Sequence, residues 1–242
     1  MLYQGKDYKA ESDYVAKLLS QDGHARKEVL EFGAGTGRHG RLLAALGFQV
    51  HGIERSREMV AAANREPAPA DKPGSFDCVQ GDICTTRMGR EFDAVIALFH
   101  VISYQTSNRD LLLTFGNAAR HLSRGGLFLF DVWHGPAVLT ERPSVRVRRV
   151  EDQETLLTRI AEPELDAGAG VVTVRYTVFA ESKSGETLTG FTEEHRMRYL
   201  FPTEIEFLAS ESGFEIELSH EFLTGKPASE RTWGVLYLLR KT

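Results

Sequence analysis

The sequence of 242 residues predicts an α/β fold with a seven-stranded sheet that is parallel except for its last strand. Two observations carry this prediction. In the first 131 residues, short apolar runs alternate with segments of helical periodicity, which is typical of a parallel sheet with helices on both faces. After Trp133 the rhythm changes to β-rich runs, which predict an antiparallel insertion after the fifth strand. We therefore expect a core of residues 1–132 and 201–242 and an insertion of residues 133–200.

The core elements follow from periodicity and from the residues at their ends. Tyr14, Val15 and Leu18 recur at helical spacing, which predicts a first helix over residues 8–20. Further helices, with ends marked by glycine, serine or proline, are expected over residues 38–46, 56–64, 108–122 and 202–212. The strands between them are expected at residues 28–32, 49–53, 76–80, 93–99, 126–132, 214–222 and 232–240.

The insertion shows no convincing amphipathic helix between Trp133 and Leu200. Its expected strands are residues 144–150, 155–160, 171–180 and 187–200, with turns at 166–170 and 182–185. One local basic cluster is formed by Arg142, Arg146, Arg148 and Arg149. It could recognise phosphate, but we favour a solvated edge strand whose charges prevent association with other strands.

Composition narrows the partners and the location. A formal net charge of −5 and a pI near 5.9 disfavour a broad footprint for nucleic acid. No apolar run approaches the roughly 18 residues of a membrane span. The charged residues Lys6, Asp7 and Glu11 leave no apolar segment for a signal peptide, so we expect a cytoplasmic protein. Cys78 and Cys84 fit neither a disulfide framework nor a metal pattern and are interpreted as packing residues.

The segment Glu31-Phe32-Gly33-Ala34-Gly35-Thr36-Gly37 joins the first strand to the second helix. Small residues at such a turn let a ligand approach backbone N–H groups and the positive end of the helix. Gly35, Gly37 and Gly40 also satisfy a dinucleotide-binding pattern, so the glycines alone fit a dehydrogenase equally well.

The neighbours of the turn separate these two interpretations. Glu31 would attract an ammonium group and repel a pyrophosphate. Glu54 ends the second strand, 21 positions after Gly33, where an acid can receive the hydroxyls of a ribose. Asp82 and Ile83 follow the third strand and suit the edge and face of adenine. The β-rich half of the chain offers no second mononucleotide unit, which disfavours the dehydrogenase.

These residues resemble the class I S-adenosylmethionine-dependent methyltransferases, which have a Rossmann-like sheet. The family's motif order matches residues 29–37, 52–59, 81–83 and 92–98. The resemblance implies S-adenosyl-L-methionine as cofactor. It implies cofactor contacts from the ends of the first four strands, namely Glu31, Gly33, Ala34, Gly35, Glu54, Arg55, Met59, Asp82, Ile83 and Leu98.

A narrower resemblance is to the amino-sugar N-methyltransferases of antibiotic biosynthesis. It is carried by Tyr3-Gln4-Gly5-Lys6-Asp7-Tyr8, Glu194-His195-Arg196 and Leu200-Phe201-Pro202-Thr203-Glu204. It implies a nucleotide-linked amino sugar as acceptor and closure of Tyr3 and Tyr8 over the cofactor. The chain departs from that family in having Tyr104, where a substrate-side histidine is expected, and in a shortened N-terminal motif.

The acceptor side is expected beyond the fourth and fifth strands, because open α/β sheets bind ligands at the carboxyl ends of their strands. His100 and Tyr104 are the candidate catalytic residues. Trp133 and His134 could line the acceptor pocket, and Arg231 could meet a phosphate. Structural roles stay open for these residues: a core histidine, a buried aromatic, a solvated arginine. No spacing supports a metal site.

We therefore predict an S-adenosylmethionine-dependent enzyme that methylates an amino group of a small molecule. An O-methyltransferase or a glycine-type N-methyltransferase is the nearest alternative, and a non-catalytic cofactor-binding subunit is the alternative from another class. The insertion would cover the acceptor or pair two subunits in a homodimer.

Overall fold

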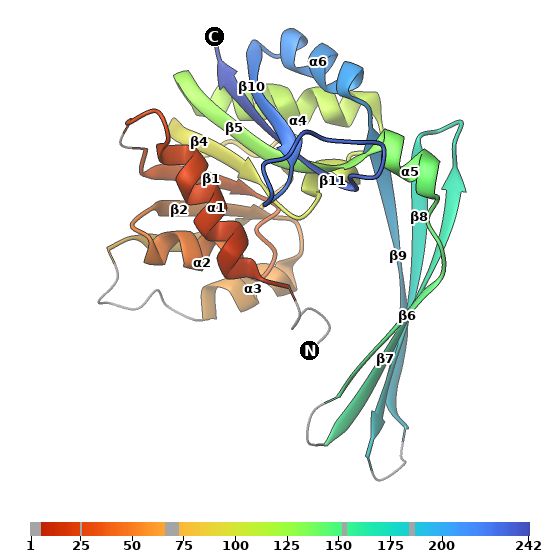
Figure 1. The fold of residues 1–242 in the computed structure, drawn as a ribbon. Coiled ribbons are helices and arrows are strands. Elements are labelled where there is room, and N and C mark those ends of the chain that lie inside the picture. The colour runs from red at the N-terminus through yellow and green to blue at the C-terminus, as the bar shows by residue number, and fades with distance from the viewer. Residues whose placement is uncertain (1–5, 25, 66–72, 152–153, 184–186) are drawn as a thin grey trace.

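The computed structural model describes residues 6–24, 26–65, 73–151, 154–183 and 187–242 (Figure 1). Its core sheet confirms the predicted seven strands, in the order β3-β2-β1-β4-β5-β11-β10. These strands are β1 (Glu28–Phe32), β2 (Gln49–Glu54), β3 (Ser75–Gln80), β4 (Phe92–Ala97), β5 (Leu122–His134), β10 (Phe214–Glu221) and β11 (Gly234–Lys241). Strands β1 to β5 are parallel, and β11 runs antiparallel to both β5 and β10.

Helices cover both faces of this sheet. Helices α1 (Tyr8–Ser20) and α2 (Arg38–Ala45) pack on one face through an apolar cluster that includes Leu19 and Leu43, and α3 (Arg57–Arg65) packs beside them over β2 and β3. Helices α4 (Asn108–His121) and α6 (Pro202–Glu211) cover the other face. No helix in the described parts of the chain is long and apolar enough to cross a membrane.

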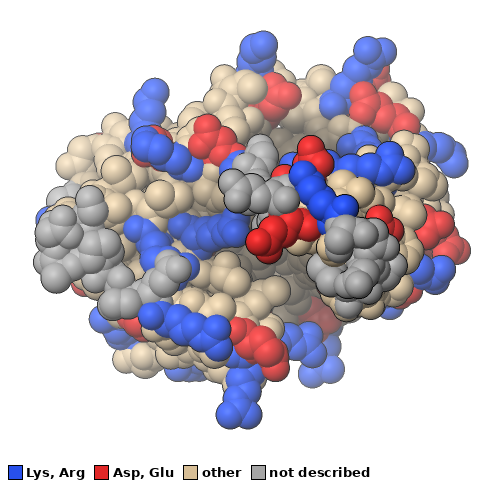
Figure 2. Space-filling model, turned by 90° about the horizontal axis from the view of Figure 1, so that it is seen from below, with Lys and Arg blue, Asp and Glu red and all other residues tan. Residues whose placement is uncertain are grey.

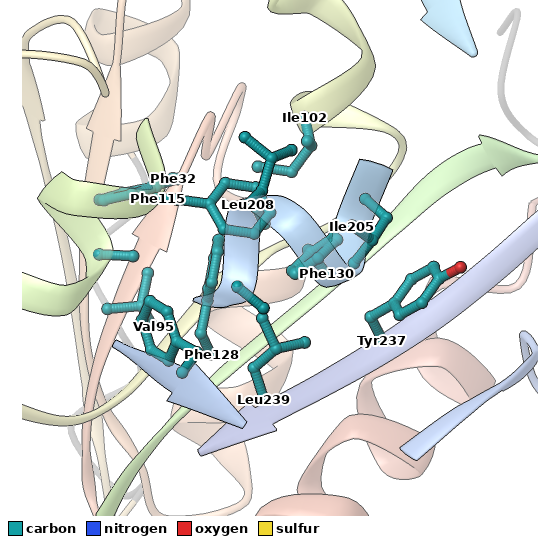
Figure 3. Packing of buried hydrophobic residues seen from close by; sticks show 14 of the residues in the cluster. Phe32, Val95, Ile102, Phe115, Phe128, Phe130, Ile205, Leu208, Tyr237 and Leu239 are labelled. Carbon is teal, nitrogen blue, oxygen red and sulfur yellow. The ribbon is translucent and has the colours of Figure 1, made fainter. Parts of the chain in front are cut away.

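Aromatic side chains fill the core beneath α4 and α6 (Figure 3). The Phe128 ring lies 5.3 Å from that of Phe115, 4.7 Å from that of Phe130 and 5.7 Å from that of Phe214. Such tilted pairs bury large apolar areas, which is the main favourable contribution to folding.

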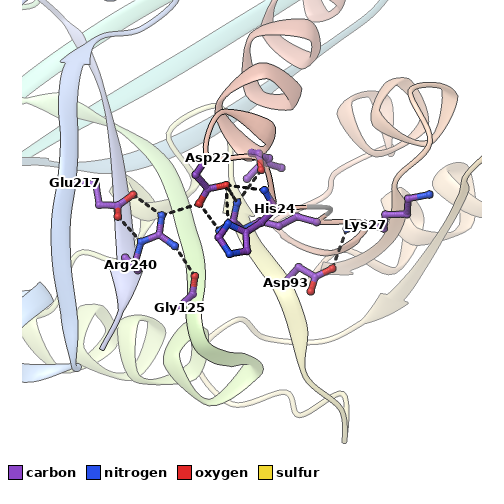
Figure 4. Close-up of polar contacts among 9 residues, drawn as sticks. Asp22, His24, Lys27, Asp93, Gly125, Glu217 and Arg240 are labelled. Carbon is purple, nitrogen blue, oxygen red and sulfur yellow. Dashed lines mark hydrogen bonds and ion pairs between the residues drawn. The ribbon is translucent and has the colours of Figure 1, made fainter.

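Charged side chains join the end of α1 to the far strands (Figure 4). Arg240 of β11 donates to the carboxylates of Asp22 and Glu217 and to the carbonyl oxygen of Gly125. Hydrogen bonds from Arg26, together with those from Arg240, hold the pKa of Asp22 well below its ordinary value. This network fixes the carboxyl end of α1 against β11.

The insertion consists of β6 (Arg146–Glu151), β7 (Thr155–Asp166), β8 (Val171–Ser182) and β9 (Thr187–Leu200), paired antiparallel. Figure 1 shows these strands running away from the core as a long twisted ribbon. The insertion joins the core sheet where Trp133 and His134 of β5 pair with Tyr199 and Leu200 of β9. Strand β6 is the edge strand, as we favoured for the basic cluster.

Several local expectations were wrong: strand β7 continues six residues beyond its expected end, and strand β5 begins four residues early. A short helix α5 (Gly135–Glu141) begins the insertion, where no helix was expected. Pro136 in its first turn favours helix initiation, but seven residues are too few to display a helical period. Strand β4 ends at Ala97, two residues early, because Phe99 and His100 take left-handed backbone conformations before the 3₁₀ helix η1 (Val101–Tyr104).

We expect Phe128→Ala to lower the free energy of unfolding by about 3–5 kcal/mol, because it leaves a cavity among three rings. Phe207→Ala is the matched control, since Phe207 is 57% exposed, and should change stability by less than about 0.5 kcal/mol. Urea denaturation followed by circular dichroism measures both. Equal losses in the two variants would contradict this packing.

Candidate functional site

The glycine turn lies between β1 and α2, at the carboxyl edge of the sheet. Gly33 and Gly35 have φ values of 65° and 56°, which residues with a side chain rarely adopt. A Cβ on Gly33 would lie 2.5 Å from Val101 of η1, so the turn packs directly against that helix. A Cβ on Gly35 would meet no described atom within 4 Å, which leaves its backbone open to a ligand.

Glu54 holds the turn in place from the end of β2. Its carboxylate accepts the N–H of Gly35 at 2.9 Å and the N–H of Ser56 at 2.8 Å. The acid thus joins the glycine turn to the loop that begins α3. A carboxylate of this kind can also accept hydroxyl groups from a ligand lying over the turn.

Glu31 is an acid buried beneath α2, with 2% of its surface exposed. Burial raises its pKa to about 8, so it holds a proton at neutral pH. Its Oε2 atom has no hydrogen-bond partner among the described residues. A Cβ on Gly40 would lie 2.7 Å from Oε2, so glycine at that position leaves room for the carboxyl group. A buried oxygen without a partner suits a cationic ligand group.

A chain of polar groups leads from Glu31 to the N-terminal segment. His39 Nδ1 is 4.0 Å from Glu31 Oε1, and His39 Nε2 is 2.7 Å from Glu11 Oε2. Lys6 Nζ is 3.1 Å from the same oxygen of Glu11 and 3.3 Å from the centre of the Phe99 ring. Burial lowers the pKa of Lys6. Sequence reasoning selected Glu31 but not Lys6, Glu11 or His39, which come together only after α1 packs on α2.

Tyr8 is the described member of the predicted tyrosine pair, and Tyr3 lies outside the described residues. The Tyr8 ring centre is 4.9 Å from that of His39 and 5.0 Å from the guanidinium carbon of Arg38. Tyr8 therefore stands beside the first turn of α2.

The ends of β2, β3 and β4 hold the other predicted cofactor residues. Asp82 is exposed, and its Oδ1 accepts the N–H of Cys84 at 2.8 Å. Ile83 and Leu98 are buried in the core, whereas Met59 is 46% exposed and Arg55 is also exposed.

His100 and Asp131 form a close pair at the ends of β4 and β5. His100 Nδ1 is 2.7 Å from Asp131 Oδ2, and Asp131 Oδ1 accepts the His100 backbone N–H at 3.1 Å. Burial of Asp131 opposes its ionisation, but His100 and Lys6 outweigh this and lower its pKa. The pair fixes the imidazole ring, so that its Nε2 atom is the one available for chemistry. A lone acid in the apolar run of β5 was the signal that could have revealed Asp131.

Trp133 lies next to this pair, with its ring centre 6.2 Å from that of His100. His134 is buried, and burial lowers its pKa. Its Nδ1 atom has no hydrogen-bond partner among the residues that the structure describes. Arg231 is exposed in the loop before β11.

Tyr104 contacts the insertion. Its hydroxyl is 2.8 Å from Nδ1 of His195 on β9, and His195 Nε2 is 3.2 Å from Glu193 Oε1. His195 was noted in a sequence motif, but its contact with Tyr104, 91 positions earlier, could not be read from the sequence.

The face of the molecule seen from below carries both signs of charge. Figure 2 shows lysine, arginine, aspartate and glutamate side chains interspersed around a hollow on the face seen from below. Within the described ranges, no group of three His, Cys, Asp or Glu side chains is placed to hold a metal ion.

Comparison with known proteins gives a methyltransferase domain over residues 29–126. The dTDP-3-amino-3,6-dideoxy-alpha-D-glucopyranose N,N-dimethyltransferase of Streptomyces fradiae is 28% identical over 225 residues, covering 93% of this chain and 83% of that protein. The dTDP-3-amino-3,4,6-trideoxy-alpha-D-glucopyranose N,N-dimethyltransferase of Streptomyces venezuelae is 25% identical over 227 residues, covering 94% and 90%.

A crystal structure of an S-adenosylmethionine-dependent methyltransferase from Clostridium acetobutylicum ATCC 824 shares the fold. Its TM-score is 0.84 at 21% identity, and the match covers 100% of this chain and 94% of that one. The domain match, the relatives that align along nearly the whole chain and the shared fold agree with the residues of the glycine turn. Together they show that this chain contains a methyltransferase domain and has the fold of S-adenosylmethionine-dependent methyltransferases.

Proposed function

We propose that this enzyme methylates the amino group of a small molecule, and that a nucleotide-linked amino sugar is the acceptor. One observation carries the proposal: both sugar N,N-dimethyltransferases match more than nine-tenths of this chain, so the similarity includes the insertion as well as the cofactor core. The insertion is the part of the chain that the cofactor motifs do not account for.

The residues at the turn fit S-adenosylmethionine, which supplies an electrophilic methyl group on a cationic sulfur. Glu31 would face the ammonium of its methionine part, because its buried carboxyl group has an oxygen without a partner. Glu54 would receive the ribose hydroxyls, and Gly33 and Gly35 would admit the ligand to the backbone. The further proposed contacts around the cofactor are Tyr3, Tyr8, Ala34, Arg55, Met59, Asp82, Ile83 and Leu98.

The acceptor would lie between the core and the insertion, residues 133–200. His100, held by Asp131, and Tyr104 are the proposed catalytic residues. Trp133 and His134 would line the pocket, and Arg231 would meet a phosphate of the nucleotide. A cytoplasmic location and a homodimer formed through the insertion are parts of the same proposal.

Methylation of a hydroxyl group is the second candidate, because one observation favours it. A hydroxyl needs a positioned base, and the 2.7 Å contact of His100 with Asp131 resembles such an arrangement. An amine needs only to lose its proton before attack.

An acceptor assay tests the proposed function. We expect the purified enzyme to add two methyl groups in succession to the nitrogen of a nucleotide-linked 3-amino sugar. Mass spectrometry counts the methyl groups on the product, and NMR identifies the methylated atom. The matched control is the same sugar nucleotide with a hydroxyl in place of the amine. Methylation of the hydroxyl compound instead would reject the amine, and cofactor binding without any turnover would favour a non-catalytic subunit.

Glu31→Gln tests the ammonium contact. Because the free enzyme holds a proton on Glu31, with a pKa of about 8, binding of a ligand ammonium should release that proton. The affinity of the wild type for S-adenosylhomocysteine should therefore rise with pH through that value. The variant should bind about tenfold or more weakly above pH 8, with no release of this proton. Calorimetry in buffers of different ionisation enthalpy measures both quantities.

Stability of the ligand-free enzyme supplies the control for Glu31. The raised pKa of Glu31 stabilises the folded wild type, and this contribution is complete below pH 4.5, the ordinary pKa of a glutamate. The contribution is lost as the pH rises through about 8. Glu31→Gln should therefore gain stability relative to wild type with rising pH, by up to about 1.4 kcal/mol per unit. Glu28→Gln, at the start of the same strand where the side chain is 42% exposed, should show neither effect. Proton release unchanged in Glu31→Gln would contradict the assignment.

Glu54→Ala tests the ribose contact. Loss of an acceptor for two hydroxyls should weaken binding of S-adenosylhomocysteine about tenfold to a hundredfold. Glu54→Gln retains an oxygen that can accept the N–H of Gly35. This variant therefore separates distortion of the glycine turn from loss of the contact with the ribose. Glu91→Ala, at an exposed position, is the control. Wild-type affinity in Glu54→Ala would exclude the ribose role.

A further inference from the structure

Three side chains form a line of polar contacts from η1 into the insertion. The Tyr104 hydroxyl is 2.8 Å from His195 Nδ1, and His195 Nε2 is 3.2 Å from Glu193 Oε1. The His195 side chain is 26% exposed and that of Glu193 is 47% exposed, so the line reaches solvent. The cofactor motifs of the core do not include His195 or Glu193.

The strands of the insertion hold this line. Side chains alternate along β9, so Glu193 and His195 share one face, while Glu194 lies on the other and pairs with Arg175 at 3.7 Å. Tyr176 of β8 packs its ring edge-on to His195, with centres 5.1 Å apart. Arg159 of β7 lies over the Tyr176 ring at 4.9 Å. Within the described ranges, the charged and titratable groups that face His195 are Tyr104, Glu193 and Tyr176, with Arg159 behind Tyr176.

The other end of the line is beside the glycine turn. Tyr104 ends η1, the helix whose Val101 packs against Gly33. Ser103, next to it, accepts the N–H of Trp133 at 3.2 Å. The Tyr104 hydroxyl thus belongs to the rim formed by β1, β4 and β5, where ligands of open α/β sheets bind.

We propose that His195, oriented by Glu193, is a positioning residue that receives the proton of the methyl acceptor through the Tyr104 hydroxyl. This inference rests on the proposed function, because the acceptor atom must carry a proton that it loses. In the tautomer with the proton on Nε2, which faces the Glu193 carboxylate at 3.2 Å, Nδ1 accepts from the Tyr104 hydroxyl. The tyrosine oxygen in turn can accept a hydrogen bond from the acceptor amine, which orients the nitrogen lone pair.

The transfer balances. The acceptor nitrogen forms a bond to the methyl carbon, and the carbon–sulfur bond breaks with its electrons remaining on sulfur. The proton of the nitrogen passes to the Tyr104 oxygen as the Tyr104 proton passes to His195 Nδ1. The resulting imidazolium is stabilised by Glu193 and loses a proton to water at the exposed end of the line.

The test compares pH profiles of kcat and KM for the acceptor that the wild type methylates. In His195→Gln we expect kcat to fall about tenfold to a hundredfold, its acidic limb to move to higher pH and KM to change little. Glu193→Gln should shift the same limb by less. Glu194→Gln and the exposed His24→Gln are matched controls and should behave as wild type.

Three further variants keep the proposal falsifiable. Tyr104→Phe breaks the same link from the core side, so its effect should not add to that of His195→Gln in the double variant. Additive losses would overturn the proposal. A wild-type acidic limb in His195→Gln, or a limb that moves only in His100→Gln, would overturn it as well.

The acceptor assay keeps this failure distinct from failure of the proposed function. Turnover of an amine with an unchanged His195→Gln profile rejects the proton line alone. Turnover only of the hydroxyl compound rejects the amine, and a shifted His195→Gln profile on that compound still supports the line. Absence of turnover with every acceptor rejects both.

Discussion

Strand β5 imposes the constraint on which the rest of the molecule depends, because its backbone is paired with three different strands. It pairs with β4 on one side, with β11 along the other, and with β9 through its last two residues. Buried backbone groups must be paired, so each of these neighbours is held in one register. The core sheet, the C-terminal strands and the insertion are therefore positioned against a single strand of 13 residues.

Acidic side chains gather where the parallel strands end. Glu31, Glu54 and Asp131 come from the ends of β1, β2 and β5, and two of them are almost fully buried. Burial of an acid without a full set of partners lowers stability, and such a cost is typical of binding sites. Lys6 partly offsets it, because its positive charge helps to lower the pKa of Asp131. A ligand with positive charge would relieve the remainder, which is consistent with a sulfonium cofactor.

The sequence predicted the elements whose pattern is local. The alternation of β1 to β5 with helices and the strands of the insertion showed the correct hydrophobic period within a short stretch of sequence. The glycine turn was recognised from its composition. The same method missed helix α5, because its seven residues are too few to show a helical period. It also missed the end of β4, because no glycine marks the turn at Phe99. The polar chain of Lys6, Glu11 and His39 was also missed, because its members meet only after α1 packs on α2.

The contact of Tyr104 with His195 shows how the fold places a residue that no local pattern can place. Strand β9 meets β5 where Tyr199 pairs with Trp133. His195 lies four residues earlier, on the same face of β9 as Tyr199, because side chains alternate with a period of two. A slip of one residue in this register would turn His195 away and bring Glu194 toward Tyr104. The pairing of β9 with β5 therefore decides which side chain of the insertion contacts Tyr104.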